Sequence, residues 1–223
     1  HGGMFPTGGE RHAQCVLDMR DTFGKAVAGN GQMVECQHEF SHRRSIFRRR
    51  KPRLLPKCKR KAKMDLTARK NALRKQAFTA RAEAFERASV AEANAALLEE
   101  IGPVTGKVIA AYMAMRTELD PTRAMTALAD ANRICVPVIE ANGQPLKFRE
   151  WRPGCRMVDG PFGARVPDNG DWLEPEIVIA PLVAFDRGCN RLGYGGGFYD
   201  RTLEGLRAKR PTLAIGFAYA AQE

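Results

Sequence analysis

Residues 176–219 read EIVIAPLVAFDRGCNRLGYGGGFYDRTLEGLRAKRPTLAIGFAY, and they alternate between strand-like and helix-like patterns. An apolar run at 176–185 is typical of a buried strand, and a second β-rich apolar segment follows at 212–219. A glycine-rich loop and a helix-like segment at 199–209 separate the two. A strand, loop, helix and strand in this order predict parallel strands with a helix packed on the sheet.

The residues upstream show the same alternation. Apolar side chains recur at helical spacing between 65 and 101, which predicts two helices, and Gly102 and Pro103 are typical of a helix end. Asp120 before Pro121 predicts another helix start, since a carboxylate caps free N–H groups and proline suits the first turn. The apolar stripe of the first segment consists of Leu66, Leu73, Ala77, Ala80 and Ala84.

The upstream pattern completes the fold prediction. A loop rich in Gly, Pro and Asp separates it from residue 176. The whole alternation predicts an α/β fold with three layers, an open, largely parallel sheet with helices on both faces. Such sheets bind ligands at the carboxyl ends of their strands. The expected upstream elements are helices within 65–101, a strand at 107–115, a helix from 121 to about 131, and strands at 133–139 and 145–151.

Length and composition exclude several classes of protein. The chain has 223 residues, 44% of them hydrophobic, which is typical of a globular protein and excludes a fully disordered or fibrous one. The longest strongly apolar stretch, 177–185, is interrupted by Pro181 and is much shorter than the roughly 20 residues that cross a bilayer. We therefore expect no membrane-spanning segment.

The formal net charge of +11 is concentrated in one part of the chain. Residues 1–63 carry +10 of it, and the run 43–63 has 12 basic and no acidic residues, which favours disorder. The periodic pattern begins only after Met64. We therefore predict a basic leader at 1–63, disordered or not native to the protein, and a folded domain at 64–223. A nucleic-acid-binding arm and an organelle-targeting leader are the alternatives for the leader, although its five acidic residues count against targeting.

Cysteine and histidine positions limit the chemistry. The six cysteines are at least 20 residues apart and form no CxxC pair, so neither a zinc knuckle nor a redox dithiol is indicated. Cys135 lies in an apolar run, which is typical of an inert thiol, and we infer a reducing, cytoplasmic setting. Residues 64–223 contain no histidine, which excludes a Ser-His-Asp mechanism and a histidine-based zinc site there.

The glycine-rich loop at 191–200, RLGYGGGFYD, is a candidate phosphate site. Residues without Cβ allow backbone N–H groups to approach an anion, and the following helix N-terminus adds positive potential. The loop lacks the Gly-Lys-Ser/Thr of a Walker A motif and departs from the dinucleotide GxGxxG pattern, so a flexible turn is the alternative. Asp200 either stabilises the helix dipole or, beside a bound phosphate, holds Mg²⁺.

Three further charged residues are candidates for ligand binding. Lys70 and Arg74 are four residues apart, so they share one helix face and could clamp a polyphosphate. A solvated basic face is the alternative, because Arg69 and Lys75 stand beside them. Glu118 falls between a predicted strand and the next helix, and it is either a ligand-binding carboxylate or an exposed turn residue.

The segment 181–201, PLVAFDRGCNRLGYGGGFYDR, resembles the signature of the 5-formyltetrahydrofolate cyclo-ligase family. Three further motifs occur in the family's order: KNALR at 70–74, ELDP at 118–121 and GPFG at 160–163. The resemblance covers residues 66–223. It implies an open-sheet fold of the kind shared by ribose-5-phosphate isomerase-like and CoA transferase-like proteins.

The resemblance implies an enzyme that uses ATP and Mg²⁺ to convert 5-formyltetrahydrofolate, with or without a polyglutamate tail, to 5,10-methenyltetrahydrofolate. ATP phosphorylates the formyl oxygen, N10 attacks the activated carbon, and phosphate leaves as the ring closes. Such a protein holds its reactants in line and neutralises the phosphoryl charge. The rival hypothesis is an RNA-binding protein that uses the basic arm at 43–63.

The resemblance also assigns residues, though none as acid, base or nucleophile. Tyr194 and Phe198 stand where some relatives carry Arg and Tyr, and Phe198 supplies no hydroxyl. For ATP the resemblance implies Lys70, Arg74, Arg191, Leu192, Gly193, Tyr194, Gly195, Gly196, Gly197, Phe198 and Tyr199. For the folate it implies Arg74, Met113, Glu118, Tyr194 and Phe198, and for the metal Asp200.

The end of the sequence carries one more expectation. The family usually continues beyond the strand at 212–219 into a short segment with a second acidic Mg²⁺ contact and a closing strand, whereas this sequence ends at Glu223. We therefore expect the strand at 212–219 to have an unpaired edge. In a polypeptide that stops there, we expect weaker metal binding and lower stability.

Overall fold

The computed structural model describes residues 14–18, 25–27, 33–34 and 65–223 of the chain. The basic run 43–63 lies outside the described residues, so the leader and the domain start at residue 64 stay predictions. Of the described helices, none is both long enough and apolar enough to cross a bilayer.

The elements come in the order that an α/β fold requires. The helices are α1 (Leu66–Phe85), α2 (Val90–Ile101), α3 (Thr122–Leu128) and α4 (Phe198–Arg207), with short 3-10 turns at η1 (Pro161–Gly163) and η2 (Ala220–Gln222). The strands are β1 (Gln14–Asp18), β2 (Lys25–Val27), β3 (Met33–Val34), β4 (Val108–Ala110), β5 (Arg133–Val138), β6 (Lys147–Trp151), β7 (Met157–Asp159), β8 (Arg165–Pro167), β9 (Trp172–Leu173), β10 (Ile177–Ala180), β11 (Ala184–Phe185), β12 (Arg191–Leu192) and β13 (Leu213–Tyr219).

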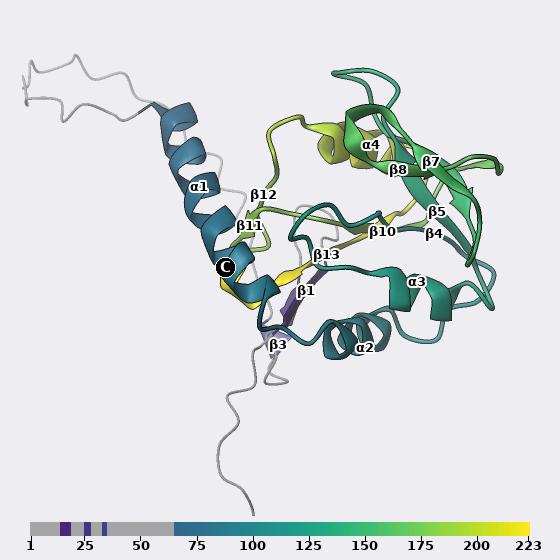
Figure 1. Cartoon of the computed structure of the whole chain (residues 1–223), viewed down its shortest axis with the longest axis horizontal. Coiled ribbons are helices and arrows are strands. Elements are labelled where there is room, and N and C mark those ends of the chain that lie inside the picture. The colour runs from purple at the N-terminus through teal and green to yellow at the C-terminus, as the bar shows by residue number, and fades with distance from the viewer. Residues whose placement is uncertain (1–13, 19–24, 28–32, 35–64) are drawn as a thin grey trace, which may run out of the picture.

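One large sheet runs through the molecule in the order β3-β2-β1-β13-β10-β4-β5-β6-β9 (Figure 1). Its four central strands, β13, β10, β4 and β5, pair in parallel, and the strands on either side pair antiparallel. The predicted α/β fold is therefore confirmed, with the parallel strands at its centre. Because β4 connects onward to β5 on one side and lies beside β10 on the other, the strand order reverses there, and such a switch point is where ligands bind.

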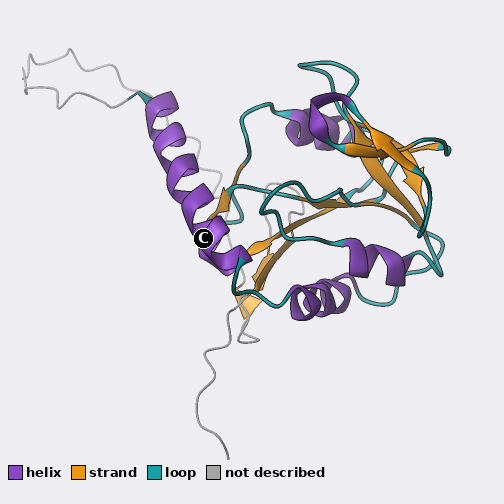
Figure 2. Ribbon diagram, viewed as in Figure 1, coloured by secondary structure: helices purple, strands orange, loops and turns teal. Residues whose placement is uncertain are grey.

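Helices cover both faces of the parallel centre (Figure 2). Alternate side chains of a strand point to opposite faces, so Ile177 and Ile179 of β10 pack in the cluster that includes α2 and α3. Val178 and Ala180 pack in the other cluster, which includes α4. All four are buried, which explains why β10 is continuously apolar.

The helix α1 is confirmed, but only the second half of its apolar stripe, from Ala77 to Ala84, packs on the fold. Leu66 and Leu73 are 64% and 46% exposed, while Ala77 is buried. The helix has most of its contacts with the body of the fold at η2, β11 and β13, and its N-terminal end extends beyond them (Figure 1). The side chains that face the fold from its second half include Phe78 and Arg81, as described below.

The residues predicted to cap helices lie at helix ends. Gly102 caps α2 with φ of +70°, a left-handed conformation that glycine adopts without strain. Asp120 accepts a hydrogen bond of 2.9 Å from the Thr122 backbone N–H at the start of α3. That helix ends at Leu128, earlier than the predicted residue 131.

Three boundaries differ from the prediction. The strand at 107–115 is limited to β4, because residues 111–118 leave the sheet and turn into the ligand-binding end of the fold. The run 176–185 is divided into β10 and β11 at Pro181, which has no N–H for a ladder. The segment predicted as a loop before residue 176 contains a hairpin of β7 and β8 and the edge strand β9.

The expected unpaired edge of β13 is wrong for the described structure. The strand β1 pairs antiparallel with β13, with Gln14 opposite Tyr219 and Asp18 opposite Ile215. An edge strand exposes unpaired N–H and C=O groups, and an extended segment of the same chain satisfies them.

Candidate active site

A cavity of about 410 Å³ lies where β4 and β10 end, between α1 and the glycine-rich loop before α4. Its walls come from segments that are far apart in the sequence. They include Lys70, Arg74, Met113 and Glu118 together with every residue of 191–200. The structure therefore brings all the residues expected to bind ATP, folate or metal to one site.

The glycine-rich loop between β12 and α4 needs glycine for its backbone and for its space. Gly195 has φ of +108°, and Gly197 has φ of +64° at the N-terminus of α4. A Cβ on Gly196 would lie 2.7 Å from the ring of Phe198. The chain therefore turns tightly into α4, and the N-terminus of this ten-residue helix adds positive potential at the cavity.

Arg74 connects α1 to this loop. Its Nε donates a hydrogen bond of 2.9 Å to the carbonyl of Gly193, and another guanidinium nitrogen donates to Asn71 Oδ1 at 2.8 Å. Lys70, one turn earlier, lines the same cavity and is exposed. Both cations line the cavity, as a clamp for a polyphosphate requires.

Glu118 is positioned by a tight turn after β4. The backbone N–H of Met115 donates to Glu118 Oε2 at 2.9 Å, and the N–H of Glu118 donates to the carbonyl of Met115. Between them Arg116 has φ of +56°, a left-handed conformation that is strained for a residue with a side chain. Glu118 is 4% exposed, so the alternative of an exposed turn residue is wrong.

Sequence reasoning missed Arg81, which stands behind the site. It is 3% exposed and donates hydrogen bonds to Thr117 Oγ1 at 3.0 Å and to the hydroxyl of Tyr194 at 2.6 Å. That hydroxyl donates to Glu118 Oε1 at 2.7 Å. The signal in the sequence was the spacing of seven residues after Arg74, which is two helical turns and places both arginines on one face.

Tyr194 has a perturbed hydroxyl. The pKa of this hydroxyl is raised to about 12, chiefly by burial. The hydrogen bond from Arg81 lowers the pKa, and the hydrogen bond to Glu118 raises it. The hydroxyl is therefore protonated at neutral pH and donates to Glu118. Burial, followed by the charge of Glu118, also raises the pKa of Tyr199.

Asp200 lies in the first turn of α4 with its side chain 73% exposed, and it forms an ion pair with Arg191. The guanidinium of Arg191 also lies over the ring of Tyr199, 5.6 Å from its centroid. In the described residues, no three His, Cys, Asp or Glu side chains gather as a metal site. A single carboxylate beside the glycine-rich loop nevertheless fits Mg²⁺, which is held by one or two carboxylates together with substrate phosphates.

Comparison with known proteins shows to which family the chain is related. Residues 57–223 match the model of the 5-formyltetrahydrofolate cyclo-ligase family. This chain belongs to that family. The predicted resemblance is confirmed.

Proteins named 5-formyltetrahydrofolate cyclo-ligase are similar to part of this cyclo-ligase family member. The one from Mycolicibacterium smegmatis is 31% identical over 123 residues, 50% of this chain and 62% of the relative. The one from Haemophilus influenzae is 35% identical over 124 residues, 52% of this chain and 66% of the relative. The matched parts thus span less than two thirds of these two relatives.

A solved structure supports the fold. The NMR structure of Aquifex aeolicus 5,10-methenyltetrahydrofolate synthetase superposes with a TM-score of 0.55 and 27% identity, covering 69% of this chain and 79% of that protein.

The remaining wall of the cavity in this cyclo-ligase family member is apolar with one cation. Arg165 of β8 lines it, and its guanidinium also donates to the carbonyl of Met157 at 3.1 Å. The ring of Phe162, in the GPFG motif, lies 6.4 Å from the ring of Phe198 in the loop. The β7–β8 hairpin therefore contacts the glycine-rich loop from the side opposite α1. The apolar members of this wall are Pro137, Ile139, Leu146 and Ala164.

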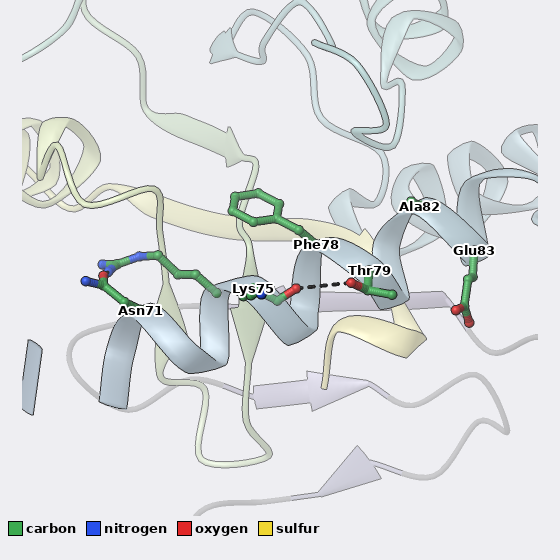
Figure 3. Close-up of a pocket in the computed structure, with 7 residues that line it drawn as sticks. Asn71, Lys75, Phe78, Thr79, Ala82 and Glu83 are labelled. Carbon is green, nitrogen blue, oxygen red and sulfur yellow. Dashed lines mark hydrogen bonds between the residues drawn. The ribbon is translucent and has the colours of Figure 1, made fainter. Parts of the chain in front are cut away.

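A second hollow, of about 590 Å³, runs along α1 (Figure 3). All the described residues that line it belong to this one helix, from Asn71 to Glu83. The Thr79 hydroxyl in it donates to the carbonyl of Lys75 at 3.3 Å, an ordinary contact within a helix (Figure 3). Among the described residues, no second element lines this hollow.

Proposed function

We propose that the cavity catalyses the ATP-dependent conversion of 5-formyltetrahydrofolate to 5,10-methenyltetrahydrofolate, with release of ADP and phosphate. One observation carries the proposal. The two cations of α1, the glycine-rich loop and the buried Glu118 face one cavity in a chain that belongs to the cyclo-ligase family.

The polyphosphate of ATP fits the side of the cavity formed by α1 and the glycine-rich loop. Lys70, Arg74 and Arg191 supply positive charge there, and the loop and the N-terminus of α4 supply backbone N–H groups. These groups neutralise the charge that is transferred during phosphorylation.

The folate fits the side formed by Glu118 and the apolar wall. A buried carboxylate accepts hydrogen bonds from the N–H groups of a pterin, and Glu118 already has its two oxygens held by Met115 and Tyr194. Met113 lies beside it in the cavity wall. Arg165 is a suitable partner for a carboxylate of the folate tail, with or without further glutamates.

The reaction requires that the formyl oxygen becomes a leaving group. The oxygen attacks the γ-phosphorus of ATP, the bond from that phosphorus to the β-γ bridging oxygen breaks, and ADP leaves. N10 then attacks the formyl carbon, its proton passes to solvent, and the C–O bond breaks with release of phosphate and formation of the N5–C double bond. The protein's residues hold the two substrates in line, and the apolar wall excludes water from the phosphorylated intermediate.

Asp200 is the residue that would hold Mg²⁺ against the ATP phosphates. Bound there, the ion neutralises phosphate charge and orients the transferred group. Asp200 would exchange its partner Arg191 for the ion, which leaves Arg191 to pair with phosphate. We also propose a cytoplasmic location, which the buried free thiol of Cys135, whose pKa burial raises, supports.

The test is the absorbance of the methenyl product when the purified chain is mixed with 5-formyltetrahydrofolate, with and without Mg-ATP. We expect product only with ATP, and a loss of at least tenfold in kcat/KM for Lys70→Ala. The matched control is Arg69→Ala, which removes the adjacent cation that does not line the cavity. A folded protein that forms no product, or equal losses in both variants, would overturn the proposal.

The RNA-binding hypothesis rests on the arm at 43–63, which lies outside the described residues. No observation in the described part of the chain favours it over the enzyme.

A further inference from the structure

Arg81 is a buried cation outside the set of residues that line the cavity. Arg81 is 3% exposed, and its guanidinium lies beside two aromatic rings, 5.2 Å from the centroid of Phe78 and 5.7 Å from that of Tyr194. Buried cations are rare unless they are paired. Three polar partners compensate this one: Thr117, Tyr194 and Glu118.

The hydrogen bonds around Arg81 have a fixed direction. An arginine only donates, and an ionised carboxylate only accepts. Arg81 donates to the Tyr194 hydroxyl at 2.6 Å, so the single proton of that hydroxyl points to Glu118, 2.7 Å away. The same guanidinium nitrogen lies 3.9 Å from Glu118 Oε1, which compensates the buried carboxylate directly.

The Tyr194 hydroxyl therefore joins two halves of the site. Tyr194 belongs to the glycine-rich loop that we propose for ATP, and Glu118 is the carboxylate that we propose for the folate. Arg81 of α1 also donates a hydrogen bond to Thr117, in the turn before Glu118, and so fixes the position of the turn relative to α1. A ligand that restrains either half also restrains the other through this hydroxyl.

We propose that Arg81 is a positioning residue that couples the binding of the two substrates, by holding the Tyr194 hydroxyl between itself and Glu118. The inference rests on the proposed function and deepens it. A folate bound at Glu118 holds Tyr194 and with it the loop in the arrangement that binds ATP. Because coupling between two sites is reciprocal, ATP strengthens folate binding by the same factor.

The test variant is Tyr194→Phe, which removes the hydroxyl and keeps the ring. The ring contact with Phe78, 5.6 Å between centroids, is preserved, so the variant retains the aromatic packing. The matched control is Tyr219→Phe, which also removes a buried tyrosine hydroxyl but at a position outside the cavity wall. Thermal unfolding of both variants establishes that they are folded.

The measurement is calorimetric binding of 5-formyltetrahydrofolate and of a non-hydrolysable ATP analogue with Mg²⁺, each alone and each with the other saturating. For the wild-type chain and for Tyr219→Phe we expect each ligand to strengthen the other at least fivefold. For Tyr194→Phe we expect that factor to fall below twofold, whatever the change in the affinity of each ligand alone.

Arg81→Lys provides a second variant. Lysine keeps the charge but has no planar fork, so it cannot span Thr117 and Tyr194 together. We expect it to lose the coupling as Tyr194→Phe does. A merely structural arginine would lower the unfolding temperature in this variant and leave the coupling factor unchanged.

Each outcome has a separate meaning. Loss of coupling in Tyr194→Phe and in Arg81→Lys, with coupling kept in Tyr219→Phe, supports the inference. Unchanged coupling in Tyr194→Phe, or binding of both ligands to the wild-type chain without coupling, overturns it and leaves the proposed function standing. If neither ligand binds the folded wild-type chain, the proposed function fails, and the coupling with it.

Discussion

The guanidinium of Arg74 donates a hydrogen bond of 2.9 Å to the backbone carbonyl of Gly193, which lies 119 positions later in the chain. The bond joins α1, the first helix of the domain, to the loop before its last helix. The loop is therefore positioned by α1 as well as by its own glycines. A second hydrogen bond, from Arg81 to the hydroxyl of Tyr194 at 2.6 Å, joins the same two elements.

Arg74→Lys tests this bond. Lysine keeps the positive charge but loses the fork that donates to Gly193 and Asn71 together. Because hydrogen bonds from charged groups contribute about 1.5–3 kcal/mol, we expect kcat/KM for ATP to fall about 10- to 100-fold. Steady-state kinetics of product formation measure the change, with Arg69→Lys as the control on the same helix. If kcat/KM for ATP is the same in Arg74→Lys as in Arg69→Lys, the hydrogen bond from Arg74 to Gly193 does not position the loop for ATP.

Gly195→Ala tests the loop backbone. A side chain at φ of +108° is strained by about 1–3 kcal/mol, and the new Cβ would lie 3.4 Å from the Arg74 guanidinium. We expect the KM for ATP to rise at least tenfold and the unfolding temperature to fall.

The matched glycine variant is Gly205→Ala. Gly205 lies in the interior of α4, and a Cβ there meets no atom within 4 Å. We expect this variant to be more stable by about 0.5–1 kcal/mol, since alanine favours helix, and to keep wild-type kinetics. Urea unfolding and steady-state kinetics of both variants decide the point. Similar kinetics in the two would show that the backbone at Gly195 is unimportant.

Glu118→Gln tests the buried carboxylate. The amide keeps the shape but leaves Arg81 without its charged partner, so we expect a loss of about 3 kcal/mol in the free energy of unfolding. We expect the dissociation constant of 5-formyltetrahydrofolate, measured alone by calorimetry, to rise at least tenfold. The ATP analogue alone should change much less, because Glu118 faces the folate half. An unchanged folate affinity in the folded variant would rule out the assignment.

Glu150 predicts a pH dependence of stability. Its side chain is 8% exposed and accepts hydrogen bonds from Arg133 at 3.1 Å and Arg152 at 3.2 Å. The bond from Arg133, with that from Arg152, lowers its pKa below the usual 4.5, although burial opposes the shift. The pKa of Glu150 is therefore lower in the folded state than in the unfolded state. At a pH above the unfolded-state pKa, the carboxylate contributes fully to stability, and this contribution is lost as the pH falls through the folded-state pKa.

We therefore expect the free energy of unfolding to fall as the pH is lowered below about 4.5, and Glu150→Gln to show a smaller fall. Urea titrations at pH 7 and at pH 4 and below give both values. Glu99→Gln, an exposed position on α2, is the control and should follow the wild-type chain. An identical pH dependence in Glu150→Gln would show that the pairing with Arg133 has no effect on stability.

Local sequence patterns predicted most of the elements that lie at the centre of the fold. β5, β6, α4 and β13 coincide closely with the expected segments, because buried strands are continuously apolar and glycine and proline mark their ends. The prediction of a strand at 107–115 was too long, because some of its apolar side chains line the cavity and do not belong to the sheet. Residues 111–115 are apolar like a strand, but they lie beyond the end of β4, and Tyr112, Met113 and Met115 line the cavity.

The candidate site was predictable where residues form a local motif. The glycine-rich loop, Lys70 with Arg74, and Glu118 are recognisable from composition, spacing and position, and the family resemblance specified their roles. Arg81 and Arg165 were not, since a charged residue on a helix or a hairpin is ordinarily a solvated one. Their placement depends on which elements pack against them.

The sequence by itself therefore determined the α/β class, the order of the elements and the membership of the family, because these follow from periodicity and from contiguous motifs. Only the tertiary structure decided that Arg81 of α1, Tyr194 of the loop and Glu118 of the turn after β4 meet through one hydroxyl. A hydrogen bond depends on a distance in space of about 3 Å, and residues more than 75 positions apart acquire it only when the sheet and its helices have packed.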